Sequence, residues 1–419
     1  MDMKRVVVTG IGAVTPIGNN IPEYLEGLKT GRSGAGPITL FDATLFKTQF
    51  ACEVKNFDPE AFIEKREARR LDRFAQFAIV SADEAVSDSG LNQILETLDL
   101  DRIGVIWGSG IGGLGSLEQE IEEFARGNGQ PRYNPFMIPK MIADIAAGHI
   151  SIKYGFRGVN YATVSACASS SHALINAFDY IRLGRNDIVI AGGSEAAIIH
   201  AGVGGFNAMK ALSTRNDDYS TASRPFDKDR DGFVLGEGGG ALVLEELEHA
   251  LKRGANIYAE VVGGGATADA YHITAPHPDG FGARNVMRLA LADAGMAPED
   301  IDYVNVHGTS TPLGDVAEAR AIQQVFGAHA YALNISSTKS MTGHLLGAAG
   351  AIEAIAGILA IQHQFIPPTI NHFTDDPELD PKLNLTFNVA QERSVRAILS
   401  NTFGFGGHNS SLILRKFDS

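Results

Sequence analysis

One stretch organises the chain: Tyr161-Ala-Thr-Val-Ser-Ala-Cys167-Ala-Ser-Ser-Ser-His172-Ala-Leu-Ile-Asn-Ala-Phe178. Its β-branched residues predict a strand, and the small residues after them predict a turn into an amphipathic helix. Cys167 stands at the turn, where the first N–H groups of a helix lack internal partners and carry the positive end of the dipole. We therefore expect a thiol that ionises readily, beside N–H groups that hold an oxyanion when sulfur attacks a carbonyl. A lone cysteine can also simply fill space in a core, and the rest of the sequence decides between the two interpretations.

The order strand, glycine-rich turn and helix recurs on both sides of this stretch. Alternating strands and helices with Val/Ile-rich strands indicate an α/β fold with buried sheets. We expect two α/β halves of similar plan, residues 1–255 and 256–419, packed tightly together with a boundary near residue 255. The expected strands are 4–9, 102–107, 188–191 and 242–244 in the first half, then 257–262, 303–307, 396–401 and 411–415 in the second.

Two local expectations concern the first half. Residues 10–18, which are rich in glycine, predict a turn after the first strand. Residues 64–70 open what we expect to be one long helix that runs on to Ser87. In that helix Arg66, Arg69 and Arg70 would share one face, which is either a solvated surface or a docking patch.

Composition excludes several classes of protein. The 419 residues are 44% hydrophobic and 20% charged, as in a soluble globular protein, and the net charge of −14 disfavours nonspecific nucleic-acid binding. Two cysteines provide no disulfide framework. The N-terminal residues do not form a signal peptide, and the most apolar helix, 348–361, is short and contains Glu353. We expect a cytoplasmic protein that binds neither nucleic acid nor membrane.

Two motifs resemble a nucleotide-binding loop and a metal-binding loop, and each lacks a residue or element that such a site requires. Gly108-Ser-Gly110-Ile-Gly-Gly113 matches the dinucleotide pattern, but the loop 127–135 follows where a strand ending in an acidic residue is required. Asp227-Lys-Asp229-Arg-Asp231 begins like a calcium loop, but its twelfth position is Gly238 instead of a glutamate. We therefore expect no nucleotide cofactor and no metal ion.

Three later stretches complete a constellation with Cys167. They are Val304-Asn-Val-His307-Gly-Thr309-Ser-Thr311-Pro, then Ser336-Ser-Thr-Lys339-Ser-Met-Thr-Gly-His344, and Asn401-Thr-Phe-Gly404-Phe405-Gly-Gly407-His408. Each has an ordinary structural interpretation when it is taken alone. Together they supply a thiol nucleophile, two imidazole donors and a lining of small residues, a set that suits acyl transfer.

These stretches, in this order, resemble the β-ketoacyl-[acyl-carrier-protein] synthases of the thiolase superfamily, and in particular their elongating, two-histidine branch. The resemblance runs nearly end to end and includes Leu212-Ser-Thr-Arg-Asn216 and Ser223-Arg-Pro-Phe-Asp227. It implies a duplicated βαβαβαββ unit in five α/β/α/β/α layers, and a homodimer. It also implies a decarboxylative condensation of an acyl group with malonyl-carrier protein in fatty-acid elongation, with no cofactor beyond the phosphopantetheine of the carrier.

The resemblance assigns roles to individual residues. Cys167 is the nucleophile, its N–H and that of Phe405 hold the oxyanion, His307 and His344 stabilise the enolate, and Lys339 orders the site. Thr309 and Thr311 match positions that bind phosphopantetheine. The acyl-pocket positions are Ile111, Phe206 and Phe233, with Phe405 as a gate, and the carrier-protein docking positions are Lys65, Arg66, Arg69, Arg70 and Lys210.

The resemblance leaves alternatives open. A polyketide ketosynthase with a dedicated carrier protein would use the same chemistry. A catalytically silent chain-length-factor subunit would lack the cysteine. A degradative thiolase would need a second catalytic cysteine, and Cys52 lies in an unrelated stretch. A structural monovalent cation near Glu353 and residues 400–401 is also compatible with the family.

Overall fold

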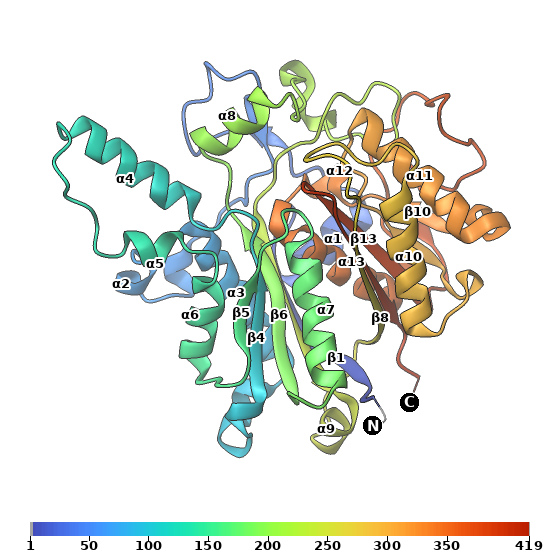
Figure 1. Ribbon diagram of the computed structural model, residues 1–419, viewed down its shortest axis with the longest axis horizontal. Coiled ribbons are helices and arrows are strands. Elements are labelled where there is room, and N and C mark those ends of the chain that lie inside the picture. Colours follow the sequence, from blue (N-terminus) through green and yellow to red (C-terminus); the bar gives the residue numbers. More distant parts are fainter. Residues whose placement is uncertain (1–2, 419) are drawn as a thin grey trace.

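The computed structural model describes residues 3–418 and shows two halves built on one plan (Figure 1). Met1, Asp2 and Ser419, which the expected ranges include, lie outside the described residues. Five strands form the main sheet of each half. They are β1 (Val6–Val14), β4 (Ile103–Gly108), β5 (Asn160–Thr163), β6 (Ile188–Glu195) and β7 (Gly238–Glu246), then β8 (Ala259–Ala268), β9 (Tyr303–Asn305), β10 (Asn334–Ser336), β13 (Ala397–Gly404) and β14 (His408–Arg415).

The two five-stranded sheets repeat each other strand for strand. The order is β5-β4-β6-β7-β1 in the first half and β10-β9-β13-β14-β8 in the second. In this order, the first three strands of each sheet pair parallel with one another. The fourth strand pairs antiparallel with both the third and the fifth. The sheets join where β1 pairs antiparallel with β8, from Val6 opposite Val261 to Val8 opposite Ala259. The repeat begins again at β8, which supports our proposal of a division near residue 255.

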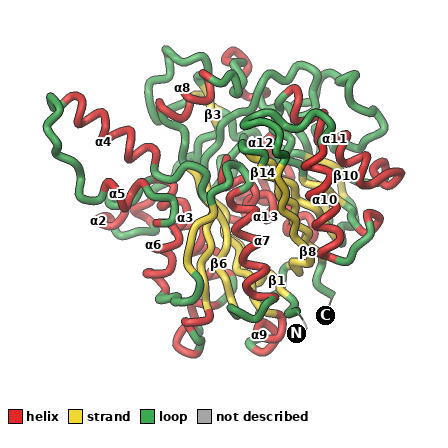
Figure 2. Tube along the Cα trace, viewed as in Figure 1, coloured by secondary structure: helices red, strands yellow, loops and turns green. Residues whose placement is uncertain are grey.

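Helices form three layers around these sheets (Figures 1 and 2). The helices α7 (Ser169–Arg182) and α13 (Ala349–His363) lie between the two sheets, and the largest core cluster includes residues from both. The outer face of the first sheet is covered by α3 (Arg73–Asp88) and α6 (Ile145–Tyr154), and that of the second by α10 (Phe281–Ala294) and α11 (Pro312–Phe326). The expected α/β fold with five layers is confirmed.

The remaining elements are short. The segment Leu346–His363 is long and apolar enough to cross a membrane. It consists of a short 3-10 turn followed by α13, and 89% of it is buried inside the protein. The other helices are α1 (Ile21–Thr30), α2 (Lys65–Ala68), α4 (Leu114–Arg126), α5 (Met137–Met141), α8 (His200–Ala208), α9 (Leu247–Lys252) and α12 (Lys339–Thr342), and two small ribbons pair β2 (Gly36–Pro37) with β3 (Phe50–Ala51) and β11 (Phe365–Ile366) with β12 (Gln391–Glu392).

The expected long helix from residue 64 to Ser87 is wrong, because it is two helices. The first, α2, ends at Ala68, and α3 begins only at Arg73. Between them Asp72 caps α3 by accepting the N–H of Phe74, and its other oxygen accepts the N–H of Ser116. Arg69 and Arg70 therefore lie beyond α2 and do not share a helix face with Arg66.

The expected turn at residues 10–18 is also wrong at its beginning, because β1 continues to Val14. The glycines serve close packing instead of turning. A Cβ on Gly10 would lie 2.2 Å from the carbonyl oxygen of Ala85, and one on Gly12 would lie 2.1 Å from that of Ser81. The backbone of α3 thus rests directly on this strand, with a bulge between Val8 and Gly10.

Candidate active site

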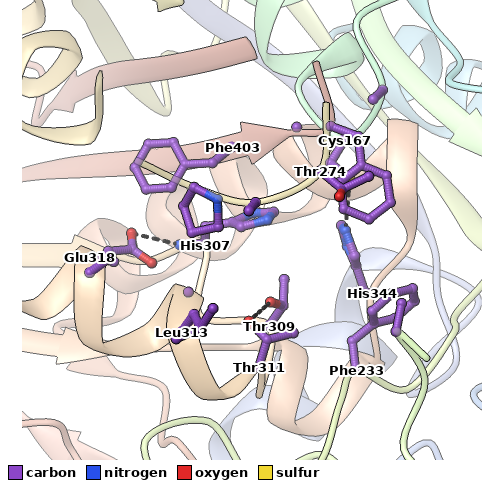
Figure 3. A pocket seen from close by; sticks show the side chains of 18 of the residues that line it. Cys167, Phe233, Thr274, His307, Thr309, Thr311, Leu313, Glu318, His344 and Phe403 are labelled. Carbon is purple, nitrogen blue, oxygen red and sulfur yellow. Dashed lines mark hydrogen bonds between the residues drawn. The ribbon is translucent and has the colours of Figure 1, made fainter. Parts of the chain in front are cut away.

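A cavity of about 770 Å³ lies at the carboxyl ends of the parallel strands and draws its lining from both halves. Ligands in open α/β sheets bind at this edge of the sheet. Every predicted catalytic and substrate-binding position except Lys339 reaches the cavity. The lining includes Cys167, His307, His344, Phe405, Thr309, Thr311, Ile111, Phe206 and Phe233, together with Lys210 (Figure 3).

The nucleophile turn joins β5 to α7. Ala166 has a positive φ of 51°, an uncommon conformation for a residue with a side chain, and Cys167 follows it, directly before the N-cap residue Ala168 of α7. Ser169 fixes the turn from inside the helix, since its hydroxyl donates to the Ala166 carbonyl and accepts the N–H of Ser165. The sequence prediction of a cysteine at the strand-to-helix turn agrees with this geometry.

The Cys167 thiol does not ionise as readily as we expected. Burial raises its pKa to about 12, although the positive charge of Lys339 and the backbone N–H groups of Phe405 and Cys167 act in the opposite direction. Helix N-terminal N–H groups lower a thiol pKa only where desolvation is weaker than their field. The resting thiol is therefore protonated, and it needs a base at hand when it attacks.

His344 is the titratable group next to the thiol. Its Nε2 lies 3.0 Å from Cys167 Sγ, and Figure 3 shows the two side chains meeting in the cavity. The His307 ring stands nearly perpendicular to the His344 ring, with 5.2 Å between their centres. Burial, and then the charge of Lys339, hold the pKa of both imidazoles well below 6.5. Both rings are therefore neutral near pH 7, and each offers one N–H donor and one free nitrogen.

Lys339 does not line the cavity. It is fully buried behind the histidines and forms an ion pair with Glu353 of α13. Its charge lowers the pKa of Cys167, His307 and His344 together. The structure thus places Lys339 where it acts on the reacting groups through its field instead of through contact with substrate.

Glu318 of α11 is a buried carboxyl that the sequence reasoning missed. Its two oxygens accept the N–H groups of His307, at 2.9 Å, and Gly308, at 2.8 Å, and the Asn401 amide also donates to it. Burial raises its pKa to about 7. Glu318 therefore fixes the backbone that carries His307 (Figure 3). A charged residue among Val316, Ala317 and Ala319, on the inward face of a predicted helix, was the available signal.

Glu195, at the end of β6, is a second buried carboxyl that the sequence reasoning missed. It accepts the N–H groups of Gly110, Ile111 and Gly347 and the hydroxyl of Ser109. Burial raises its pKa to about 7, against these donors. Glu195 thus ties the predicted acyl-pocket loop to the segment that follows His344. Nothing in the local sequence distinguishes it from an ordinary strand-end glutamate.

Phe405 occupies the tip of the β13–β14 hairpin, in a turn of three residues closed by the pairing of Gly404 with His408. A Cβ on Gly404 would lie 2.8 Å from the Ser165 carbonyl oxygen and 3.1 Å from the Cys167 nitrogen. The hairpin therefore rests directly on the nucleophile turn. The ring of Phe403, which was not predicted, packs 5.7 Å from that of His307 (Figure 3).

The predicted substrate-binding positions form two groups around the histidines. Phe206 and Phe233 pack edge to face at 5.3 Å, and Phe233 contacts His344 in the same manner at 5.4 Å. The hydroxyls of Thr309 and Thr311 lie 3.2 Å apart at the start of α11. One wall of the cavity is thus apolar and the other carries hydroxyls.

Four of the predicted docking residues are exposed and Arg70 is partly buried, and they lie in two places, near α2 and after α8. Lys210 borders the cavity after α8, whereas α2 stands beside α5 (Figure 1). Lys65 pairs with Glu60, and Arg70 packs over the ring of Phe136. Within residues 3–418, Arg66 and Arg69 form no ion pair.

The residues beside α13 fit the structural cation that the resemblance allows. Asn305 and Ser400 are neighbours in the register of β9 and β13, and Asn305 Oδ1, Ser400 Oγ and Glu353 Oε2 are buried without a partner in the described chain. Oxygen atoms suit a hard cation. The Asn401 side chain is already engaged by Glu318 and Ser411. Separately, the ligand atoms of Cys167, His307 and His344 lie within 4.8 Å of one another, a donor set that could hold a soft metal.

Two family models match this chain. The model described as "Beta-ketoacyl synthase, N-terminal domain" matches residues 3–250, and "Beta-ketoacyl synthase, C-terminal domain" matches residues 258–373. A curated relative, the 3-oxoacyl-[acyl-carrier-protein] synthase 2 of Synechocystis sp., is 52% identical over all of this chain and 99% of its own length.

Solved structures show the same similarity. The ishigamide ketosynthase/chain length factor is 38% identical, with a TM-score of 0.92 over 99% of this chain and all of that chain. A type II polyketide ketosynthase, solved in complex with its acyl-carrier protein, is 33% identical, with a TM-score of 0.90 over 99% and 100% of the two chains.

Proposed function

This chain belongs to the β-ketoacyl synthase family, and from that premise we propose how its residues carry out the reaction. It condenses an acyl-[acyl-carrier protein] with malonyl-[acyl-carrier protein] and forms a 3-oxoacyl-[acyl-carrier protein], CO₂ and free carrier protein in fatty-acid elongation. The observation that carries the assignment of roles is the contact of Cys167 Sγ with His344 Nε2, at 3.0 Å, beside His307 on the cavity floor.

Acyl transfer comes first. The neutral His344 takes the thiol proton, and the Cys167 sulfur attacks the thioester carbonyl of the acyl chain. The negative oxygen is held by the N–H groups of Cys167 and Phe405, which already face the sulfur. Collapse expels the carrier's thiol sulfur, which takes the proton back from His344. The acyl chain then lies along Phe206, Phe233 and Ile111.

Decarboxylation follows on the malonyl group. The carbon–carbon bond to the carboxylate breaks, CO₂ leaves, and the electron pair moves onto the thioester oxygen as an enolate. Once the thiol proton has left with the carrier, His344 no longer faces a thiol proton, and its neutral ring takes the tautomer with the N–H on Nε2. His307 and His344 then donate to this oxygen, because neutral imidazoles aimed at developing charge stabilise it without giving up a proton. The enolate carbon attacks the acyl-Cys167 carbonyl, and collapse breaks the carbon–sulfur bond and releases the Cys167 thiolate, which takes a proton from water. Thr309 and Thr311 bind the phosphopantetheine arm.

The assay that tests this scheme uses acyl- and malonyl-carrier protein of several chain lengths. Wild type should form a β-ketoacyl product, and Cys167→Ala should form none. The scheme is wrong if wild type makes no such product with any carrier. A preference for a dedicated polyketide carrier over the fatty-acid carrier would select the polyketide alternative. Cys167 and both histidines argue against a silent chain-length factor.

We propose that the carrier protein docks on the basic residues near α2. Arg66 and Arg69 are exposed and unpaired in the described chain, so they are available to an acidic partner. Replacement of both by Glu should raise KM for the carrier about tenfold and leave kcat unchanged, with an effect that weakens at high salt. Lys252→Glu on α9, which lies apart from α2 at the bottom of the view, is the matched control (Figure 1). An unchanged KM would remove this patch from the docking site.

We also propose a homodimer formed along β5. Both sheets end in an edge strand, but they differ. The N–H of Ile335 in β10 donates to Asn384, so that edge is covered. No described strand pairs with the outer edge of β5, and Val164 and Ile152 beside it are 62% and 78% exposed. Open edges recruit another copy. Val164→Lys with Ile152→Lys should give monomers in light scattering, and a persistent dimer would contradict the proposal.

Both cysteines are free and buried. This agrees with a reducing compartment, and we propose that the protein works in the cytoplasm.

A further inference from the structure

The two N–H groups of the proposed oxyanion hole come from different halves of the molecule. That of Cys167 belongs to the turn before α7, and that of Phe405 belongs to the tip of the β13–β14 hairpin. Donors of this kind act only when they are held within about 0.5 Å of the productive geometry. The contact between turn and hairpin must therefore be fixed by something besides the backbone of either segment.

His172 lies on α7 at this contact. Its Nδ1 is 2.6 Å from the hydroxyl oxygen of Ser165, and the Ser165 carbonyl accepts the N–H of Ala168 on the far side of Cys167. The helix α7 also packs against β14, the strand that follows the hairpin tip, and burial and the Asn409 backbone carbonyl of that strand act in opposite directions on the pKa of His172. His172 therefore binds the strand side of the nucleophile turn from a helix that packs against the strand following Phe405.

The chemistry of the ring matches both partners. Burial lowers the pKa of His172 from 6.5, so the ring is neutral near pH 7 and has one acceptor nitrogen and one N–H donor. In the tautomer in which Nδ1 accepts from the Ser165 hydroxyl, the N–H is on Nε2 and is free to donate to a carbonyl such as that of Asn409. The adjacent Ser171 makes a second tie between α7 and β13, through its hydroxyl and that of Thr402 at 3.0 Å.

We propose that His172 is a positioning residue that sets the Cys167 N–H against the Phe405 N–H and so shapes the oxyanion hole. The proposal rests on the proposed acyl transfer and adds to it a residue that does not line the cavity. His172 acts in the steps that form an oxyanion at Cys167. Decarboxylation uses His307 and His344 instead, which make no hydrogen bond to His172 in the described chain.

The test separates these two steps. In His172→Ala, single-turnover transfer of a labelled acyl group from carrier protein to Cys167 should slow about tenfold, a fraction of the loss caused by removing a whole oxyanion donor. Malonyl decarboxylation, measured with and without His172→Ala in a Cys167→Ala background, should agree within about twofold. That background has neither sulfur nor acyl carbonyl to occupy the hole. A variant that merely loosens the fold would slow both reactions.

Two conservative variants of His172 and a double-mutant cycle with Ser165 complete the experiment. His172→Asn keeps an acceptor for Ser165, and His172→Gln keeps a donor for Asn409, so each should recover part of the transfer rate. Ser165→Ala should slow transfer, and its effect should not add to that of His172→Ala. An unchanged transfer rate in His172→Ala, an equal fall in both reactions, or full additivity would overturn the proposal. Failure of wild type itself to form acyl-Cys167 would instead overturn the proposed function.

Discussion

The crossover from the third strand to the fourth is built twice in this molecule, and the two versions differ sharply. In the first half five residues, 164–168, join β5 to α7. In the second half twelve residues, 337–348, join β10 to α13, and they include the short helix α12. Both helices lie side by side between the sheets, so the two connections end at the same cavity.

The difference in length assigns different chemistry to the two connections. The short one has room only for a strained turn, and it delivers a sulfur and an N–H at a helix start. The long one turns Lys339 back onto Glu353 and sends His344 forward to Cys167. The proposed base thus comes from one half and the proposed nucleophile from the other, and neither half alone holds both.

Removing the sulfur of the short connection should have the largest effect on activity. Cys167→Ala should lower the condensation rate by at least about 10⁴-fold, because a covalent step loses its nucleophile. Decarboxylation of malonyl-carrier protein, which depends on the second half, should persist. Cys52→Ala, which removes the other buried cysteine, should keep condensation. Condensation by Cys167→Ala would show that the first half is not the nucleophile's source.

Removing either imidazole should slow decarboxylation, the step that we assign to the second half. In the Cys167→Ala background, His307→Ala or His344→Ala should slow decarboxylation by about 10²- to 10³-fold, the usual cost of one oxyanion donor. In the presence of Cys167, only His344→Ala should also slow acyl transfer. His200→Ala, at an exposed pair with Glu118, is the control. Equal effects of both histidines on transfer would contradict the assignment of His344 as the base.

Stability should also distinguish the connections. Glu353→Gln leaves the buried charge of Lys339 unpaired and should lower the free energy of unfolding by about 3–5 kcal/mol. Ser169→Ala, which removes the hydroxyl that fixes the short turn, should cost about 1–2 kcal/mol. Urea denaturation measures both. A smaller loss for Glu353→Gln than for Ser169→Ala would mean that the ion pair does not fix the long connection.

The smallest effect is a difference in pH dependence. Because the pKa of Cys167 is raised to about 12, its thiolate is scarce at neutral pH, and alkylation by iodoacetamide should rise about tenfold per unit from pH 7 to 10. Because the pKa of both histidines lies well below 6.5, decarboxylation should stay flat from pH 6 to 8. A plateau in alkylation below pH 8 would indicate an activated thiolate in the resting site.

The sequence predicts the residues that line the cavity better than the buried groups that hold them in place. Cys167, His307, His344 and Phe405, which the sequence predicts together from their motifs and from the family resemblance, all line one cavity. Glu195 could not be predicted, since it accepts backbone N–H groups that lie about 85 residues earlier in the chain. Glu318 carried a signal, a charged residue on the apolar face of a predicted helix, but its link to the N–H of His307 appears only in the folded chain. The continuation of β1 through Gly10 and Gly12 depends on the packing of α3, which no local pattern records. The ionisation of Cys167 was overestimated because burial outweighs the helix start.

The antiparallel pairing of β1 with β8 has the geometry of an isologous dimer interface, with Val6 opposite Val261 and Val8 opposite Ala259. Two identical subunits joined in this way would have to carry the same residue at both equivalent connections, thiol opposite thiol or imidazole opposite imidazole. Joining the two units in one chain removes that restriction. Each connection can then vary independently of its counterpart, and the symmetric scaffold places a thiol from one connection next to an imidazole from the other.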